Sequence, residues 1–473
     1  MATAHAGHTM ADPTFYPSAA DAAAAPREKL CYVALLKPDA VATVDLDPDS
    51  SSYGTVVNTW DAPHQASEDE FHHFGWNICS SALGGSHHHT GVMERRYLVM
   101  PGLRSSRIYI LDTGKDPRHP ELVRTIEPEE VIGKSGYSRP HTVHCGPDGL
   151  LVSAIGDDSA DGSQKRAGIF MMDHDDFSVK GPWELDHGPQ EMAYDFWWHS
   201  NDNVLMASEW GRPRDIENGV VPEALLGGRY GHRIHFFDMG TRRHIQEIDL
   251  GPGYQMSLEV RPSHDPTKTF GFMGVVINTT DLSGSVWTWW KEGGKFTARE
   301  TIKIPAIKMA ADKLPPLLKG FGAVPPIITD IGLSLDDHYL YVSCWATGQL
   351  LQYDVSDPLH PRQSGLVEIG GIGRGIKHPS GKVFAGGPQM IEISRDGKRV
   401  YSTNSLFRAW DDQFYPAGMP GAMVKVDVNT GGGLTTDPDF FVEFPGYRAH
   451  QVRLQGGDCS TDSFCFAKPF PKQ

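Results

Sequence analysis

Histidines that could bind a metal occur in three widely separated segments of the sequence. His72 and His73 are adjacent in DEFHHFGWNICSS, His141 and His144 lie in HTVHC, and His450 lies in AHQVRLQGG near the C-terminus. Neutral imidazole nitrogens suit copper, zinc, iron and nickel. If the fold brings these segments together, the five histidines are candidate metal ligands, with copper as our first choice and another transition metal as the alternative.

Two further side chains could take part in chemistry beside such a metal. Cys79 follows the histidine pair in the same segment, and its thiol could lie near the metal, although an inert buried cysteine is the simpler interpretation. Asp330, in ITDIGLSLDD, is the main carboxylate that we expect close to the level of the histidines. Because calcium and magnesium require several oxygen ligands, so few carboxylates favour a transition metal.

The elements that position these residues follow from a repeated pattern. A short apolar strand ending in Asp and a turn recurs about every 65 residues. The Asp position is occupied by Asp45, Asp112, Asp173, Asp238, Asp354 and Asp427, and Trp290 takes that place in GSVWTWWKE. A second strand and a polar turn precede each copy, so each unit offers three or four antiparallel strands. The pattern therefore predicts seven similar units.

Seven such sheets arranged radially form an all-β, seven-bladed β-propeller. The chain starts inside a unit that lacks its first strand, and YRAHQVRLQGG is an unpaired first strand at the other end. We expect these two ends to pair and to close the ring. The predicted organisation is one propeller domain over residues 30–473, preceded by a flexible arm over 1–29. Two stacked β-sandwiches are the alternative.

The first strand of each blade should line the centre of the ring. Aligned on their shared turn, the seven first strands begin near His73, His141, Tyr194, Met256, Thr329, Gln389 and His450. Three consecutive blades would then present an imidazole at one level. Strict strand alternation would turn His72 and His144 to the opposite face, unless a bulge redirects them or they bond elsewhere.

Composition and charge exclude several classes of protein. A formal net charge of −16 repels phosphate backbones, which excludes nucleic acid as a partner. No apolar run is long enough to cross a membrane, and the N-terminal stretch has neither the basic nor the apolar region of a secretory signal. Six scattered cysteines without a CxxC pair favour free thiols in a reducing compartment, so we expect a cytoplasmic protein.

The sequence resembles the selenium-binding protein family, whose members include methanethiol oxidases. HHFGWNICSS, HTVHC, AGGPQMIEIS and AHQVRLQGGDCS carry the resemblance, which extends from PREKLCYV to GGDCSTD. It implies a seven-bladed propeller and, in the oxidase members, copper-dependent conversion of methanethiol, O2 and water to formaldehyde, hydrogen sulfide and hydrogen peroxide. It also implies metal binding by the residues that match the family histidines: His72, His73, His141, His144 and His450. Cys79 matches a family cysteine.

Two positions depart from the animal members of that family. Gly54 stands where they carry a cysteine linked to selenium binding, which argues against selenium binding through that thiol. Thr347 stands where they carry a histidine, so that position supplies no ligand here.

The sequence leaves three functional alternatives to the thiol oxidase. The first is a propeller that binds metal or selenium, or acts as a scaffold, without catalysis. The second is a hydrolytic propeller with a central calcium, which would use Asp330, Gln389 and Asn77. The third places a metal at His87–His89, although this run lies in a glycine- and serine-rich stretch typical of a solvated loop.

Overall fold

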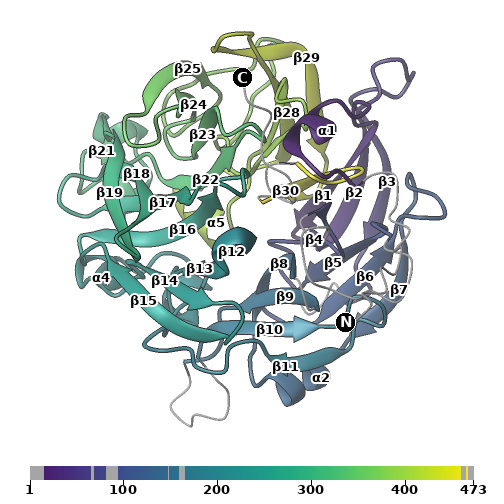
Figure 1. Cartoon of the computed structure of the whole chain (residues 1–473). Helices are drawn as coiled ribbons and strands as arrows, with labels where there is room; N and C mark the ends of the chain where they lie inside the picture. The colour runs from purple at the N-terminus through teal and green to yellow at the C-terminus, as the bar shows by residue number, and fades with distance from the viewer. Residues whose placement is uncertain are drawn as a thin grey trace, which may run out of the picture.

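A computed structural model describes residues 15–64, 69–80, 94–146, 149–158, 166–459 and 465–466. Within these residues, seven four-stranded antiparallel sheets stand in a ring around a common centre (Figure 1). The predicted all-β, seven-bladed propeller is therefore confirmed. We number the blades 1 to 7, starting with the blade that contains both ends of the propeller.

The four strands of each blade follow one another outward from the centre of the ring. From the inside outward, blade 1 contains β30 (Arg448–Leu454), β1 (Leu30–Leu36), β2 (Ala40–Asp45) and β3 (Val56–Asp61). Blade 2 contains β4 (Gly75–Trp76), β5 (Tyr97–Pro101), β6 (Ile108–Asp112) and β7 (Glu121–Ile126). Blade 3 contains β8 (Pro140–Gly146), β9 (Gly149–Ala154), β10 (Gly168–Met172) and β11 (Val179–Pro182). Blade 4 contains β12 (Phe196–His199), β13 (Val204–Ser208), β14 (Arg233–Asp238) and β15 (Arg243–Asp249).

The remaining three blades follow the same plan. Blade 5 contains β16 (Tyr254–Pro262), β17 (Phe270–Asn278), β18 (Gly284–Glu292) and β19 (Lys295–Ile304). Blade 6 contains β22 (Ile328–Leu333), β23 (Tyr339–Cys344), β24 (Gln349–Asp354) and β25 (Arg362–Glu368). Blade 7 contains β26 (Ile391–Ile393), β27 (Arg399–Thr403), β28 (Gly421–Val428) and β29 (Leu434–Phe444). A separate two-stranded ribbon joins β20 (Ile307–Lys308) to β21 (Ala323–Val324).

The repeated Asp marks the end of the third strand of a blade. Its carboxylate accepts a backbone N–H from two or three residues further on, which stabilises the turn toward the fourth strand. Asp112 accepts from the N–H of Gly114 at 2.7 Å, and Asp354 accepts from that of Ser356 at 3.0 Å. Trp290 stands on β18, the third strand of blade 5, as the repeat predicts. The repeat thus reflects a shared turn chemistry rather than a shared function.

Blade 1 closes the ring by joining the two ends of the propeller. β30 pairs antiparallel with β1, with Val452 opposite Val33 and Leu454 opposite Cys31. Buried side chains of β1, β2 and β30 form one apolar cluster with side chains of blade 7. The predicted pairing of the N- and C-terminal strands is therefore confirmed.

The described part of the predicted N-terminal arm, residues 15–29, lies against the propeller. It includes a short helix, α1 (Ala19–Ala23), whose N-cap Ser18 accepts a hydrogen bond from the N–H of Asp21. Glu28 is buried and accepts two hydrogen bonds from Arg399, at 2.7 and 2.9 Å. This part of the arm is thus anchored to blade 7.

Helices in the connections between strands cover part of the ring. They are α2 (Pro128–Ser135), α3 (Pro213–Ile216), α4 (Pro222–Leu226) and α5 (Arg408–Phe414), with the 3-10 helices η3 (Ser200–Asp202), η4 (Ala311–Lys313) and η5 (Pro316–Leu318). Residues of α3, α4, α5 and η5 belong to one apolar cluster with Met256 and Leu258 of β16 and with Tyr194, which precedes β12. No helix of the described residues is long and apolar enough to cross a membrane.

Candidate metal centre

Four of the predicted histidines meet at the centre of the ring. His72 and His73 lie just before β4, separated from it by Phe74, whereas His141 lies on β8 and His450 on β30. β4, β8 and β30 are the inner strands of three neighbouring blades (Figure 1). All four side chains are buried, with exposed fractions of 3% or less. Ring closure is what brings His450 to the others.

The distances between the rings define one compact cluster. The ring centroids of His72 and His450 are 3.9 Å apart, and those of His73 and His141 are 4.2 Å apart. Nδ1 of His72 lies 2.7 Å from Nε2 of His141. One nitrogen each of His72, His73 and His450 lie within 4.8 Å of one another, close enough to hold a single metal ion.

His72 and His73 face the same way because the backbone leaves the strand conformation here. Glu70 has a left-handed φ of 60°, and residues 72–74 are not part of β4. The neighbouring blade 1 holds this segment in place. The N–H of Phe71 donates to Asp39 at 2.8 Å, and that of Phe74 donates to Gln451 at 2.6 Å. The two histidine rings are nearly parallel, with centroids 5.0 Å apart, so strict alternation does not apply to this pair.

Backbone carbonyls orient three of the rings and select which nitrogen carries the proton. Nδ1 of His450 donates to the carbonyl of Ser405 at 2.7 Å, and Nε2 of His72 donates to that of Leu406 at 3.0 Å. Nδ1 of His141 donates to the carbonyl of Tyr194 at 3.1 Å. This arrangement leaves a lone pair on Nε2 of His450, Nδ1 of His72 and Nε2 of His141, as metal-binding histidines require.

The resulting lone pairs point at one another. In these neutral tautomers, Nδ1 of His72 and Nε2 of His141 are both acceptors, yet they lie 2.7 Å apart. Nε2 of His450 is buried and has no hydrogen-bond partner among the described residues. A buried polar atom without a partner is costly, and two facing acceptors repel. A cation bound between Nδ1 of His72 and Nε2 of His141 would remove this repulsion, and Nε2 of His450 offers a further ligand, so the residues fit a metal ion.

Burial keeps the cluster neutral. It lowers the pKa of His141 to about 4, partly offset by the hydrogen bond to the Tyr194 carbonyl, and the pKa of His450 to about 3. Burial and the neighbouring histidines lower the pKa of His72 and His73 well below the usual value. Since metals bind the unprotonated ring nitrogen, the cluster is in its binding form at neutral pH.

The other predicted site residues lie elsewhere. His144 bonds to Asp195 at 3.4 Å and packs against Trp197, with ring centroids 4.4 Å apart. Asp330 is buried, accepts the N–H of Ile391 at 2.8 Å and contacts the guanidinium group of Arg261 at 3.2 Å. The run His87–His89 lies outside the described residues.

Cys79 and Cys145 form a disulfide between blades 2 and 3. The expectation of free thiols is therefore wrong for these two residues, because the fold places their Cα atoms only 6.2 Å apart despite their distance in sequence. Cys31 and Cys344 are free and buried, and Cys459 and Cys465 are also buried. In the disulfide form, Cys79 has no thiol with which to act, and the cysteine pattern ceases to support a cytoplasmic location.

The sequence analysis missed a second buried layer, made of charged side chains. Arg261 lies between three carboxylates and contacts Asp195 and Glu259, each at 2.7 Å, as well as Asp330. Burial raises the pKa of Asp330 to about 7, an effect that the neighbouring Arg261 reduces. Arg453 and Glu392 form a further buried ion pair at 3.2 Å. Glu259, Glu392 and Arg453 each follow an aligned first-strand position by three residues, so the alignment of first strands contains a signal for these charged residues.

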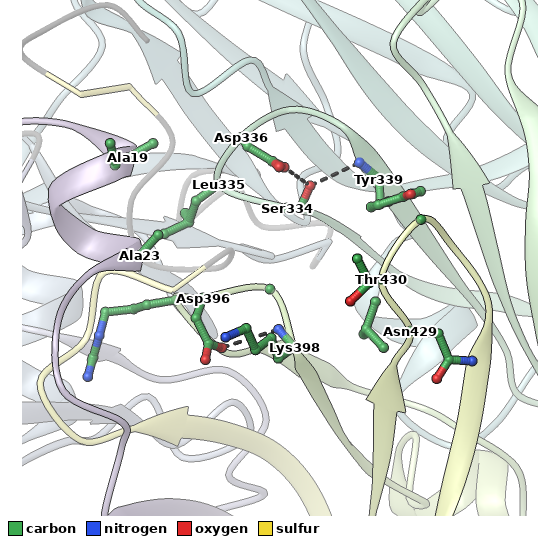
Figure 2. Close-up of a pocket in the computed structure, with 15 residues that line it drawn as sticks. Ala19, Ala23, Ser334, Leu335, Asp336, Tyr339, Asp396, Lys398, Asn429 and Thr430 are labelled. Atoms are coloured by element: carbon green, nitrogen blue, oxygen red, sulfur yellow. Dashed lines mark hydrogen bonds between the residues drawn. The ribbon is translucent and has the colours of Figure 1, made fainter. Parts of the chain in front are cut away.

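A pocket that is distinct from the histidine cluster lies between α1 and the turns of blades 6 and 7 (Figure 2). Its polar groups are already used within the turns. Ser334 donates to Asp336 and accepts the N–H of Tyr339 at 2.9 Å, and the N–H of Lys398 donates to Asp396 at 3.2 Å (Figure 2). The histidine cluster is therefore the stronger candidate for chemistry.

The fold and the histidine cluster define a β-propeller with a candidate metal centre on its axis. The model of the 56kDa selenium binding protein family matches residues 9–465, and the chain belongs to this family. A Xenopus laevis protein named methanethiol oxidase is 38% identical over 94% of this chain and 97% of its own length. An Arabidopsis thaliana protein named selenium-binding protein 1 is 37% identical and covers 94% of each chain.

Solved structures agree with this assignment. That of a hypothetical selenium-binding protein from Sulfolobus tokodaii has a TM-score of 0.91 and 50% sequence identity, and the match covers 96% of this chain and 100% of that one. A putative 6-phosphogluconolactonase from Bacteroides uniformis matches with a TM-score of 0.52 and 11% identity over 91% of this chain, which reflects the propeller fold alone.

Proposed function

We propose that this protein is a metal-dependent thiol oxidase that acts on methanethiol and uses copper. The relatives named methanethiol oxidase match almost the whole chain and support the reaction type. The main support for metal dependence is that the lone pairs of two ring nitrogens, Nδ1 of His72 and Nε2 of His141, face each other in the histidine cluster. Four neutral imidazoles suit copper, although zinc and iron accept the same ligands.

In this proposal His72, His73, His141 and His450 bind the metal. The carbonyls of Ser405, Leu406 and Tyr194 act on the metal indirectly, because they fix the tautomer of the ligands. His144 is left out, since its ring bonds to Asp195 instead. A bound copper would supply redox chemistry with O2 and an affinity for thiolates.

The remaining residues provide the environment of the reaction. Trp210 is stacked on His72, with ring centroids 6.0 Å apart, and Phe407 lies edge-on to the same ring at 5.8 Å. These side chains exclude water and offer apolar surface to a methyl group. The hydroxyl of Tyr194 lies 3.3 Å from Nε2 of His73 and restrains that ring beside the cluster. The overall reaction is methanethiol, O2 and water to formaldehyde, hydrogen sulfide and hydrogen peroxide.

The test combines metal analysis with product analysis. Protein purified without a histidine tag is loaded with copper and supplied with methanethiol, and formaldehyde, sulfide and peroxide are measured against O2 consumed. We expect the three products in equal amounts, and we expect His141→Ala to lose both copper and turnover. Bound copper without these products would contradict the oxidase and favour a carrier of metal or selenium. Wild-type turnover by His141→Ala would contradict the proposed site.

A further inference from the structure

An apolar pocket lies beside the histidine cluster, between α4, η5, α5 and the inner part of blade 5. Every side chain that lines it is apolar. At its outer edge Leu226 is 69% exposed and Phe321 is 42% exposed, whereas Trp410 on its floor is only 2% exposed. The pocket therefore leads from the surface into the covered end of the propeller.

The floor of this pocket is also the wall of a second, narrow cavity that reaches the cluster. Met256, Val276, Ile327 and Trp410 line both spaces. On the far side of these four residues, the narrow cavity is bounded by His72, Tyr194 and other side chains. The four shared side chains, which we call the constriction, thus lie between the apolar pocket and the narrow cavity that His72 lines.

The backbone of the constriction is strained at two positions. Met256 has a φ of 62° and Ile327 a φ of 52°, in the left-handed region that β-branched residues in particular avoid. Surrounding hydrogen bonds hold both in place, since the N–H of Met256 donates to Gly231 and the carbonyl of Ile327 accepts from Trp345. Strain of this kind is concentrated at ligand-binding sites. Met256 is also unbranched, so its side chain can move aside without a backbone shift.

We propose that the apolar pocket binds the alkyl group of a small thiol on its way to the histidine cluster, and that the constriction limits the length of alkyl chain that passes. This inference rests on the proposed thiol oxidase. A lining without polar groups gives water little to bond to, but it accommodates a methyl group and O2. Each additional methylene that does not fit costs about 1–3 kcal/mol, or roughly 10–200-fold in selectivity.

Two variants test the pocket at its ends. Val276→Ala widens the constriction, and Leu226→Trp fills the outer edge. Leu185→Trp is the matched control for the second, because Leu185 is similarly exposed, at 61%, and does not line the pocket. Two measurements are made on each protein: kcat/KM for methanethiol and 1-propanethiol with copper bound, and xenon binding by NMR in metal-free protein, with and without ethanethiol as competitor.

We expect Val276→Ala to raise kcat/KM for 1-propanethiol relative to methanethiol about tenfold. Leu226→Trp should raise KM for methanethiol and weaken xenon binding, whereas Leu185→Trp should change neither. In wild-type protein ethanethiol should displace xenon. If xenon does not bind, or if Val276→Ala leaves the chain-length preference unchanged while methanethiol is still oxidised, the pocket assignment is overturned and the proposed function stands. Displacement of xenon in a protein that oxidises no thiol would support the pocket and contradict the oxidase.

Discussion

His72 and His450 stack on each other with ring centroids 3.9 Å apart, although one precedes the first strand of blade 2 and the other lies on the last strand of the chain. Their ring nitrogens are held by successive carbonyls of one loop, those of Leu406 and Ser405. The cluster is therefore tied to the connection that leads into α5 as well as to the closure of the ring.

Replacement of His450 by alanine should remove metal from the protein. The variant loses a nitrogen that has no other partner, and even the loss of an outer partner of a metal ligand costs roughly 10–100-fold in affinity. We expect at least a tenfold fall in copper affinity, measured by elemental analysis after dialysis against a graded chelator. His144→Ala is the control and should retain copper. Equal retention by both variants would contradict the proposed ligand set.

Removal of the disulfide should reduce stability without removing metal. A native cross-link of this kind contributes about 2–4 kcal/mol, mainly through the unfolded chain. The double variant Cys79→Ser with Cys145→Ser should therefore unfold at lower denaturant concentration, yet bind copper with wild-type stoichiometry. Reduction of the unfolded wild-type protein should release the thiols of Cys79 and Cys145, which thiol titration before and after reduction detects. Loss of copper in the double variant would assign Cys79 a direct role at the metal.

Arg261→Met should destabilise the protein strongly. The substitution leaves Asp195, Glu259 and Asp330 buried without their shared cation, and breaking a buried ion pair on one side costs about 3–5 kcal/mol. Arg362→Met provides the control, because Arg362 is 79% exposed in its pair with Asp354 and should change the free energy of unfolding by less than about 1 kcal/mol. Chemical denaturation of both variants gives the comparison. A similarly small loss of unfolding free energy in both variants would show that water or bound protons stabilise the buried carboxylates in the absence of Arg261.

The carboxyl group of Asp39 should make stability depend on pH. Burial raises its pKa to about 7, and the backbone N–H groups of Phe71 and Glu70 reduce that effect. The folded protein therefore binds a proton that the unfolded chain has lost, so this group's contribution falls as pH rises from about 4 to 7.

Asp39→Asn removes this titration and keeps an acceptor for Phe71. We expect the stability of the variant relative to wild type to increase by more than about 1 kcal/mol between pH 4 and 7, since one pKa unit corresponds to about 1.4 kcal/mol. Denaturation of metal-free protein across this range measures the difference, with the exposed Asp49→Asn as reference. A constant difference between variant and wild type would show that the Asp39 pKa is not raised.

Much of the architecture was predictable because one turn chemistry repeats along the chain. The Asp near the end of the third strand in six units, with Trp290 in its place in the seventh, indicated the number of blades, and alignment of the first strands placed His73, His141 and His450 at one level. The direction of the His72 side chain was harder to predict. It depends on the left-handed φ of Glu70 and on the hydrogen bond from the N–H of Phe71 to Asp39 of the neighbouring blade. The disulfide was missed because spacing in sequence does not indicate that Cys79 and Cys145 face each other across two blades.

The position of β30 also fixes when the centre can exist during synthesis. The ribosome makes β1 first and β30 after all the other described strands. His450 can therefore join His72, His73 and His141 only after the strands of every other blade have been translated. A truncated product would carry three of the four histidines but no closed ring to hold them. Under the proposed function, the metal site is therefore complete only after the last described strand has been made.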